Sequence, residues 1–595
     1  MLNINKTIEY ALIAIRHINN NGTNKLCSSR EIANIYNIPQ ELLAKTLQKL
    51  CKKGYLISRK GLNGGYSLNR NLEKIKAKRT IAMISHPDAG KTTLTEKFLL
   101  FGGAINQAGK VKAKDGALKT RSDFMKMERD RGISISSSAM SFDYKSSWFN
   151  LVDTPGHSDF SEDTYRALSA VDSSIMIIDG AKGVESQTKK LFEVCRLRDM
   201  PIITFCNKMD RESRELIEII DEIQEMLAID VTPLSWPIGS GSNFSGVYNV
   251  LKNEFEIFKT TPTSNKVDKV IISGLQNKEV YNHVDLEVME KFFDEFNLAT
   301  GLLPKFTRKD FLDGTLSPIF FGSALNSIGV DHLMDSICEI APSPGNFETE
   351  SRTVLATENK VSGFVFKIQA NTDTKHRDRV AFLRLSSGHF RKGMKLYHSR
   401  LDKNITVSNP VMFLGQNRDT TEDAYAGDII GIPNHGTLRI GDTLSEGEKI
   451  KFKNLPSFAP EILKSVSCPD PLKSKHLDKA LSQFAEEGLA SVFKTLISSS
   501  WIIGVIGQLQ FDVLKSRIET EYGLPIRYEQ TNFITARWLI GEKKSVEEFI
   551  DKNREQIAID NDGKDVFLPR IQWDIDRAIK DYPNIELKNV KTFSF

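Results

Sequence analysis

The stretch Ser85-His-Pro-Asp-Ala-Gly-Lys-Thr92 decides the fold, because it follows a short apolar run and opens an amphipathic one. A small turn between a strand and a helix lets backbone N–H groups and the positive end of the helix dipole surround phosphates. Lys91 would reach the β- and γ-phosphates, and the Thr92 hydroxyl would bind Mg²⁺. Ser85 stands where the strict pattern has glycine. The stretch predicts a P-loop inside an α/β domain.

Around this stretch, short apolar runs alternate with amphipathic ones, a pattern typical of a parallel sheet with helices on both faces. The expected strands are Thr80–Ser85, Trp148–Asp153, Ser174–Asp179, Ile202–Asn207 and Pro318–Ser323, and the expected helices are Lys91–Leu100, Ser186–Leu197, Ser213–Leu227 and Asp331–Ile340.

Three further motifs end expected strands of this sheet. In Asp153-Thr-Pro-Gly-His157 a carboxylate can hold Mg²⁺ through water, and the Gly156 N–H can sense a γ-phosphate. In Asn207-Lys-Met-Asp210 the final carboxylate can accept both N1–H and N2–H of guanine, Lys208 can lie over the base, and Asn207 can tie this loop to the P-loop. Each motif alone is more often an ordinary turn or loop.

The pair Ser323-Ala324 ends the last expected strand and can place the Ala324 N–H on guanine O6. Open α/β sheets bind ligands at the carboxyl ends of their strands, where all four motifs fall in order. A P-loop kinase or ATPase would lack the guanine-reading pair. The combination therefore predicts a GTPase that binds GTP/GDP and Mg²⁺.

The segments His86–Thr92, Arg131-Gly-Ile-Ser-Ile135 and Asp153–His157 resemble translational GTPases such as elongation factors G and Tu. The resemblance implies that His157 is the catalytic residue, orienting the attacking water once ribosomal RNA positions it. Ser134 falls where most members have a threonine that binds Mg²⁺. The candidate GTP-binding residues are Ser85, His86, Pro87, Asp88, Ala89, Gly90, Lys91, Thr92, Asp153, Thr154, Pro155, Gly156, His157, Asn207, Lys208, Met209, Asp210, Ser323 and Ala324, and the candidate metal ligands are Thr92, Ser134 and, through water, Asp153.

The charged segment Thr120–Arg131 is expected to be the nucleotide switch. By the resemblance, Asp88 helps to bind a monovalent cation, although a loop-stabilising turn explains it equally well. The chain has no obvious arginine finger beyond the candidates Arg129 and Arg131. Slow intrinsic turnover and dependence on an external activator are therefore expected.

Ile84–Gly103, Glu162–Ala170 and Gly363–Gly388 are similar to bacterial release factor three almost residue for residue, and the resemblance covers about residues 77–595. It implies a ribosome-activated GTPase that removes class I release factors from the ribosome after peptide release. A different translational GTPase, for example a tRNA-carrying one, stays open. So does a DNA-binding regulator gated by a nucleotide.

Residues 1–75 resemble the start of the Rrf2 family of winged-helix regulators, through Glu9-Tyr-Ala-Leu12, Arg30-Glu-Ile-Ala33, Leu42–Leu50 and Gly61-Leu-Asn-Gly-Gly-Tyr66. The cysteine cluster and the dimerising helix of that family are missing, and Arg70–Lys78 reads as a short connector. Without a dimer, half-site recognition loses its geometry, so DNA binding is possible but doubtful. Phosphate backbones, including ribosomal RNA, could still meet the wing and the basic residues Lys45, Lys49, Lys52 and Lys53.

Charge divides the chain in the same way. Residues 1–79 carry fifteen Lys and Arg against four Asp and Glu, whereas the remaining residues carry 65 against 72. A small basic module on a mildly acidic body suggests a nucleic-acid contact at the N-terminus, although such segments are often merely solvated. The six cysteines are scattered without pairing or metal-ligand spacing, as expected for reduced thiols.

At 595 residues the chain is too long for one core. We expect a multidomain α/β protein with a winged-helix domain at 1–76, a GTP-binding domain at 77–348, a β-barrel domain at 349–455 and a C-terminal α+β domain at 456–595. No apolar run is long enough to span a bilayer and no signal peptide is evident, so a cytoplasmic protein without membrane contact is expected. The resemblance to ribosome-binding factors implies a monomer.

Overall fold

The computed structural model describes residues 6–20, 26–53, 55–59, 64–68, 71–105, 128, 134–196, 198–259, 268–370, 379–414, 417–453, 457–498 and 500–591. The expected switch Thr120–Arg131, with Arg129 and Arg131, lies outside the described residues except for Glu128. The loop at 60–63 in the expected wing lies outside them too. Within the described part of the chain, no helix has the length and apolar character needed to cross a membrane.

The N-terminal module is three helices and a hairpin. Its elements are α1 (Lys6–Asn20), α2 (Ser29–Tyr36), α3 (Gln40–Lys52), β1 (Leu56–Arg59) and β2 (Gly65–Leu68). Helix α2 begins after Ser28, which caps it and forms a capping box with Glu31. Apolar residues from all three helices meet in one small core, which includes Ala14, Ile32 and Leu47. This is the winged-helix arrangement expected from the sequence.

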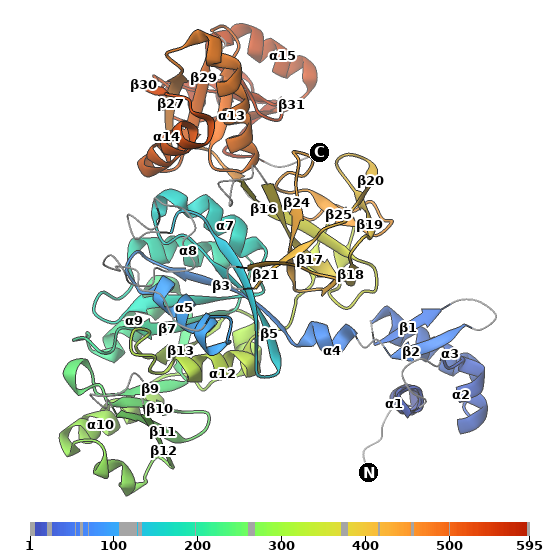
Figure 1. Ribbon diagram of the computed structural model, residues 1–595, viewed down its shortest axis with the longest axis vertical. Helices are drawn as coiled ribbons and strands as arrows, with labels where there is room; N and C mark the ends of the chain where they lie inside the picture. Colours follow the sequence, from blue (N-terminus) through green and yellow to red (C-terminus); the bar gives the residue numbers. More distant parts are fainter. Residues whose placement is uncertain are drawn as a thin grey trace.

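The connector between this module and the rest of the chain contains a helix, α4 (Asn71–Lys76), that the sequence did not predict. Six residues are too few for a helical period to show. Ile75 packs with Ala356, Tyr425 and Ala426 of the β-barrel domain, and Lys74 Nζ donates to the Tyr425 hydroxyl at 2.8 Å. The module therefore extends from the body on α4 and rests against the β-barrel domain there (Figure 1).

The α/β domain is built on the strand order β4-β5-β3-β6-β7-β13-β8. These strands are β3 (Lys78–Ser85), β4 (Ser138–Tyr144), β5 (Ser147–Asp153), β6 (Ser173–Asp179), β7 (Ile202–Asn207), β8 (Asp230–Pro233) and β13 (Leu316–Phe321). The helices around them are α5 (Lys91–Phe101), α7 (Ser161–Ser169), α8 (Ser186–Arg196), α9 (Leu216–Leu227) and α12 (Val330–Ile340). Apolar clusters lie on both faces of the sheet, which explains its continuous apolar strands.

The five expected strands run parallel, but the sequence did not predict β4, which pairs antiparallel with β5 through residues 138–144 and 147–153. The sequence also missed a small subdomain inserted after β8. It consists of β9 (Ser235–Ile238), β10 (Gly246–Asn249), β11 (Glu254–Lys259), β12 (Asp268–Ser273), α10 (Leu286–Leu302) and α11 (Arg308–Leu312). Its four strands form a separate sheet, far from the N-terminal module in Figure 1.

The β-barrel domain has the many short antiparallel strands that its glycine turns predicted. They are β14 (Phe347–Glu348), β15 (Thr353–Val354), β16 (Ser362–Ala370), β17 (Arg379–Ser387), β18 (His389–Arg391), β19 (Lys395–His398), β20 (Lys403–Thr406), β21 (Val411–Leu414), β22 (Asn417–Thr420), β23 (Asp423–Tyr425), β24 (Ile429–Pro433) and β25 (Thr443–Ser445). At Leu414 and Ser141, β21 pairs with β4, so the barrel strands continue into the sheet of the α/β domain.

The C-terminal domain mixes helices with an eight-stranded sheet in the order β30-β27-β29-β28-β32-β33-β31-β34. Its elements are β26 (Ser457–Phe458), β27 (Ile462–Ser467), α13 (Ser474–Glu486), β28 (Ser491–Thr495), β29 (Trp501–Val505), α14 (Gln508–Tyr522), β30 (Arg527–Gln530), β31 (Arg537–Gly541), α15 (Lys543–Lys552), β32 (Ile557–Asp560), β33 (Asp565–Phe567), α16 (Gln572–Asp581), β34 (Ile585–Lys588) and β35 (Val590–Lys591). The expected α+β character is present.

Candidate functional site

The candidate site lies at the edge of the α/β sheet where its parallel strands end. β3 lies between β5 and β6 and runs parallel to both, and β7 and β13 continue in the same direction. The carboxyl ends of parallel strands meet at one edge. The four motifs that follow β3, β5, β7 and β13 are therefore brought together, although β6 and other elements separate them in the sequence.

Asn207 connects three of these loops. Its Nδ2 donates to the Ala89 carbonyl of the P-loop at 2.8 Å, and its Oδ1 accepts from the Ala324 N–H at 2.9 Å. Gly90 has a φ of +96° and packs so closely that an added Cβ would lie 2.2 Å from Asn207 Nδ2. Only glycine fits at this point of the P-loop, on both conformational and steric grounds.

The P-loop cation and the carboxylate of the next motif lie side by side. Lys91 Nζ contacts Asp153 Oδ1, and both side chains are buried. Thr92 follows at the start of α5 and is half-buried. The hydroxyls of Thr92 and Ser134 and the Asp153 carboxylate make an all-oxygen donor set, which suits a hard cation such as Mg²⁺ rather than a soft metal. The residues present thus fit the expected metal.

The loop after β5 is fixed to the sheet and leaves His157 at the surface. Thr154 Oγ1 donates to the Met83 carbonyl of β3 at 2.6 Å, and Thr164 Oγ1 of α7 donates to the Pro155 carbonyl at 3.2 Å. His157 Nδ1 accepts the Asp159 N–H at 3.2 Å, and its side chain is 36% exposed. The half-buried Gly156 precedes it.

The loops after β7 and β13 form the other side of the site. The Met209 N–H donates to the Gly322 carbonyl at 3.2 Å and its side chain is buried, so Met209 anchors the loop and leaves Asp210 half-buried in the following turn. Ser323 exchanges backbone hydrogen bonds of 3.0 Å with Ile328 in both directions. Because the Ala324 N–H already binds Asn207, its expected bond to guanine O6 requires a shared hydrogen bond.

Asp179 is a site residue that the motif search missed. It ends β6, and its Oδ2 lies 2.7 Å from Lys208 Nζ, while its Oδ1 accepts the Ala181 N–H at 2.9 Å. Burial would raise the pKa of this carboxyl, but the bond from Lys208 prevails and the pKa is lowered. Its place at the end of a central strand was a usable signal, because the neighbouring strands already carried motifs there.

His86, expected among the GTP-binding residues, turns its side chain toward α8 instead. The buried ring lies with Nδ1 3.4 Å from Thr188 Oγ1 and Nε2 3.8 Å from Glu185. Burial lowers the pKa of His86, so the imidazole is neutral at neutral pH. Only its backbone lines the P-loop. Pro87 is half-buried, and the exposed Asp88 has a φ of +65°.

The segment that follows the expected switch is bound by a lysine of the β-barrel domain. Lys367 of β16 is buried, and its Nζ donates to Ser136 Oγ at 2.6 Å and to Ser137 Oγ at 2.8 Å. Asp163 of α7 accepts from Lys367 at 3.1 Å and from the Ser137 N–H at 2.5 Å. Ser134, the candidate metal ligand, is half-buried at the start of this segment. No motif pointed to Lys367.

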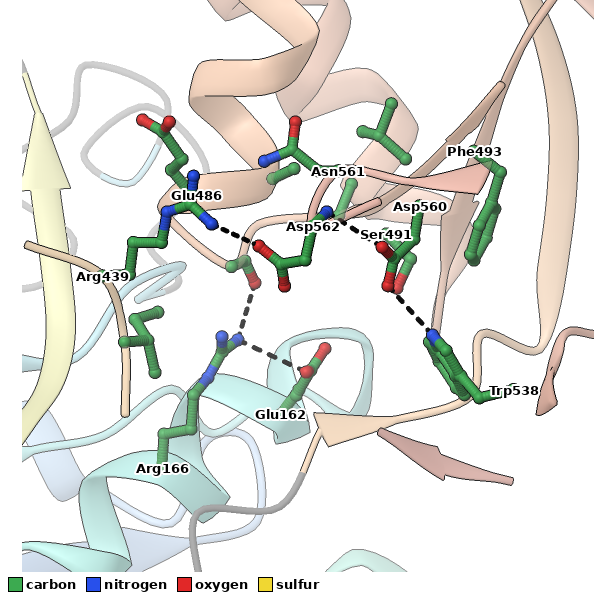
Figure 2. Close-up of a pocket in the computed structure, with 15 residues that line it drawn as sticks. Glu162, Arg166, Arg439, Glu486, Ser491, Phe493, Trp538, Asp560, Asn561 and Asp562 are labelled. Carbon is green, nitrogen blue, oxygen red and sulfur yellow. Dashed lines mark hydrogen bonds and ion pairs between the residues drawn. The ribbon is translucent and has the colours of Figure 1, made fainter. Parts of the chain in front are cut away.

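The C-terminal domain contacts the same region from another side. Arg166 Nη2 of α7 donates to the Gly488 carbonyl at 2.6 Å, and the Leu509 N–H at the start of α14 donates to Asp159 Oδ2 at 2.7 Å. Figure 2 shows the pocket where the domains meet, in which Arg166 lies beside Glu162. In the same pocket, Arg439 of the β-barrel domain pairs with Asp562 of the C-terminal domain. The loop that carries His157 is therefore attached to the C-terminal domain two residues further on.

Different parts of the chain match different known families. Residues 76–343 match the elongation factor Tu GTP binding domain, residues 360–447 match elongation factor G domain 2, and residues 452–579 match the class II release factor RF3, C-terminal domain. Residues 4–98 match the Rrf2 family, described as an iron-dependent transcriptional regulator. The last match runs past the N-terminal module into β3 and α5, which belong to the α/β domain.

A crystal structure of a protein from Thermus thermophilus is similar in fold, with a TM-score of 0.61 and 21% sequence identity over 76% of this chain and 67% of that one. The family matches account for the α/β domain, the β-barrel domain and the C-terminal domain in turn. The α/β domain is therefore a translational GTPase domain, which hydrolyses GTP, and the chain joins it to a domain of the class II release factor RF3 C-terminal type and to an Rrf2-type module at the N-terminus.

Proposed function

We propose that this chain is a ribosome-activated GTPase that drives class I peptide chain release factors off the ribosome after translation termination. The observation that carries the proposal is the RF3-type C-terminal domain, matched over residues 452–579, in direct contact with the loop of His157. Through Leu509 and Asp159, a movement of that domain would reach the water-orienting residue. Among translational GTPases, this domain is what favours a release factor over a tRNA carrier.

Guanine would be selected at the edge formed by the loops after β7 and β13. The Asp210 carboxylate would accept the two N–H groups that guanine presents and adenine lacks. Lys208, held by Asp179 at 2.7 Å, would cover one face of the base. Asn207 would keep this loop in register with the P-loop, because it already binds both Ala89 and Ala324.

The phosphates would lie against the P-loop backbone, with Lys91 moving from Asp153 to the β- and γ-phosphates. Thr92, Ser134 and, through water, Asp153 would hold Mg²⁺, which when bound neutralises charge on the phosphate oxygens. His157 would orient the attacking water through Nε2, since Nδ1 accepts the Asp159 N–H. At 36% exposure its side chain needs an outside surface to fix it, which explains activation by the ribosome.

The remaining assignments are part of the same proposal. The partners are the ribosome, including its RNA, and the class I release factors, and the chain acts as a cytoplasmic monomer. The proposed domain boundaries are 1–76, 77–348, 349–455 and 456–595. The nucleotide-binding residues of the four motifs, the first of which begins at Ser85 and the last of which ends at Ala324, are proposed, and so are the metal ligands.

A second function, the binding of nucleic acid by the N-terminal module, is favoured by one feature. This feature is the exposed basic surface of α3. Lys45 and Lys49 lie on this surface, and Lys53 follows the helix and is exposed too. Such a surface suits a phosphate backbone, and a single module on a ribosome-binding body would meet ribosomal RNA before DNA. A gel-shift titration with ribosomal RNA fragments and with DNA tests this, and equal, salt-sensitive binding without sequence preference would exclude a DNA-binding regulator.

The main proposal is tested with stop-codon ribosomes that carry a fluorescent class I factor after peptide release. Adding the chain with GTP should release the factor within one turnover, and His157→Ala should slow GTP hydrolysis on the ribosome by about 10²–10⁴-fold. The control His283→Ala alters a residue outside the proposed site. Ribosome-stimulated hydrolysis without factor release would instead assign the chain another task in translation.

A further inference from the structure

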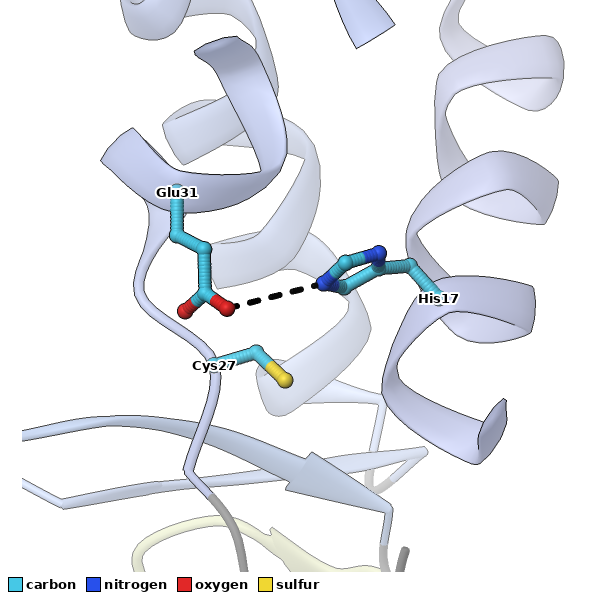
Figure 3. A group of neighbouring side chains, drawn as sticks. All are labelled: His17, Cys27 and Glu31. Carbon is cyan, nitrogen blue, oxygen red and sulfur yellow. Dashed lines mark ion pairs between the residues drawn. The ribbon is translucent and has the colours of Figure 1, made fainter. Parts of the chain in front are cut away.

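The N-terminal module contains a cluster of side chains that its winged-helix fold does not require. His17 near the end of α1, Cys27 before α2 and Glu31 in the first turn of α2 place their ligand atoms within 4.8 Å of one another. Figure 3 shows the three side chains converging from separate segments, with the imidazole directed at the carboxylate. His17 and Cys27 are buried and Glu31 is half-buried.

Neighbouring groups orient the imidazole and the carboxylate of this cluster. The second ring nitrogen of His17, Nδ1, lies 3.3 Å from the Tyr36 hydroxyl, and the two rings meet edge-on. Glu31 Oε2 accepts the Ser28 N–H at 3.3 Å in the capping box. These contacts leave His17 Nε2 and Glu31 Oε1 facing each other at 3.9 Å. A partner on the second ring nitrogen is the usual arrangement for a metal-binding histidine.

The backbone of Cys27 is fixed as well. Its N–H donates to the Tyr66 carbonyl at 3.0 Å and its carbonyl accepts the Tyr66 N–H at 2.8 Å, so Cys27 is joined to the hairpin strand β2. Gly65 packs against it so tightly that an added Cβ would lie 2.8 Å from the Cys27 carbonyl oxygen. The thiol therefore projects from a rigid position between α1 and α2.

We propose that His17 Nε2, Cys27 Sγ and Glu31 Oε1 bind one divalent transition metal of the Zn²⁺ class. Bonds of about 2.0–2.3 Å to nitrogen, oxygen and sulfur in a tetrahedron separate the ligand atoms by roughly 3.3–3.8 Å. The 3.9 Å between Nε2 and Oε1 is close to this range, and Cys27 Sγ lies within 4.8 Å of both, so side-chain rotations would complete the site. A mixed nitrogen, sulfur and oxygen set selects against Mg²⁺ and Ca²⁺.

An ion pair between His17 and Glu31 is the competing explanation, and a variant of Cys27 distinguishes it from a metal site. The Glu31 side chain is 33% exposed, which gives an ion a path of entry and leaves a fourth position for water. The bound metal would join α1, α2 and, through the Cys27 backbone, the hairpin. Its expected effect is to stabilise the module, because metal binding is coupled to the folded arrangement of its ligands.

The test is a titration of the full-length, metal-free chain with Co²⁺, followed by competition with Zn²⁺. We expect one Co²⁺ per chain with a thiolate charge-transfer band, displaced by Zn²⁺. The band should disappear in Cys27→Ser and persist in Cys51→Ser, a matched control from the same module core. Glu31→Gln preserves the capping box and should weaken binding about 10–100-fold, so it decides the outcome if Cys27→Ser fails to fold.

Two results would overturn the proposal. One is the absence of stoichiometric Co²⁺ or Zn²⁺ binding by the folded wild-type chain. The other is a band that survives unchanged in both Cys27→Ser and Glu31→Gln. The test does not measure GTP hydrolysis, so its failure would refute the metal site without refuting the proposed function.

Discussion

Two of the joints that the β-barrel domain makes with its neighbours are built in opposite ways. Toward the α/β domain, the fully buried Arg384 binds Asp172 at 2.6 Å and Thr80 at 2.6 Å, and it also contacts the Gly427 carbonyl. Toward the N-terminal module, the main polar contact is between the exposed Lys74 and the Tyr425 hydroxyl. Removing the partner of a buried charge costs much free energy, whereas breaking an exposed contact costs little.

This difference separates the coupled part of the molecule from the appended part. Beside the proposed nucleotide site, the α/β domain is bound to the β-barrel domain through Lys367 and to the C-terminal domain through Arg166 and Asp159, so a change in one domain is expected to reach the others. The module touches the body through a helix of six residues, a small apolar cluster and a 3.4 Å hydrogen bond from Thr357 Oγ1 to the Lys53 carbonyl. The proposed GTPase cycle should therefore depend on the first joint and not on the second.

The strongest way to break the first joint is Arg384→Ala, which leaves Asp172 buried without its cation. We expect a loss of about 3–5 kcal/mol in the free energy of unfolding, measured by urea denaturation. The control Arg391→Ala removes an exposed arginine of the same domain and should change stability by less than about 0.5 kcal/mol. Equal effects of the two variants would mean that the buried network contributes no more than surface charge.

A smaller but more specific effect is expected at the nucleotide. Asp210→Asn should weaken GTP binding about 100-fold, since it removes a charged acceptor for the guanine N–H groups, and it should favour xanthosine triphosphate. The control Asp221→Asn on the exposed face of α9 should bind GTP normally. Fluorescent-nucleotide titration measures both. Unchanged GTP affinity in Asp210→Asn would remove Asp210 from the proposed guanine site.

The contact between the C-terminal domain and α7 can be tested with two glycines of similar conformation. Gly488 has a φ of +69° and an added Cβ would lie 1.7 Å from Arg166 Nη1, whereas Gly523 has a φ of +64° and open space around it. Both Gly→Ala variants should lose about 1 kcal/mol from backbone strain. Only Gly488→Ala should also slow ribosome-stimulated GTP hydrolysis, because it separates the domains.

The smallest effect is expected at the second joint. Lys74→Ala should change the stability of the body by less than about 1 kcal/mol and leave GTP hydrolysis unchanged, but it should speed proteolytic cleavage around α4. Lys76→Ala, an exposed lysine of the same helix, is the control. A loss of hydrolysis in Lys74→Ala alone would show that the module is coupled to the body after all.

The sequence predicted the loops of the site better than the contacts that surround them. Apolar strands ending in Ser85, Asp153 and Asn207 could be recognised locally. Because the sheet is parallel there, the ends of these strands, and so the motifs, lie at the same edge. The strand Ser138–Tyr144 was missed because it mixes serine and alanine and contains no β-branched residue. The helix α4 gave no periodicity because six residues are too few to show one.

Lys367 shows why a contact between domains is hard to predict. In a strand of alternating character, a lysine between Val365 and Ile368 suggests a solvent-facing position. The structure has an irregular register between Val365 and Lys367, and the ammonium is buried against Asp163 of another domain. Neither the irregularity nor the partner is visible in the local pattern.

The most direct test of the proposed function compares the full chain with a chain that starts at residue 77, using stop-codon ribosomes loaded with a fluorescent class I factor. We predict that both release the factor at similar rates with GTP, and that neither does so without nucleotide. Failure of both chains to release it, while ribosomes still stimulate their GTP hydrolysis, would contradict the proposed function. Failure of the shorter chain alone would contradict the separation of module and body.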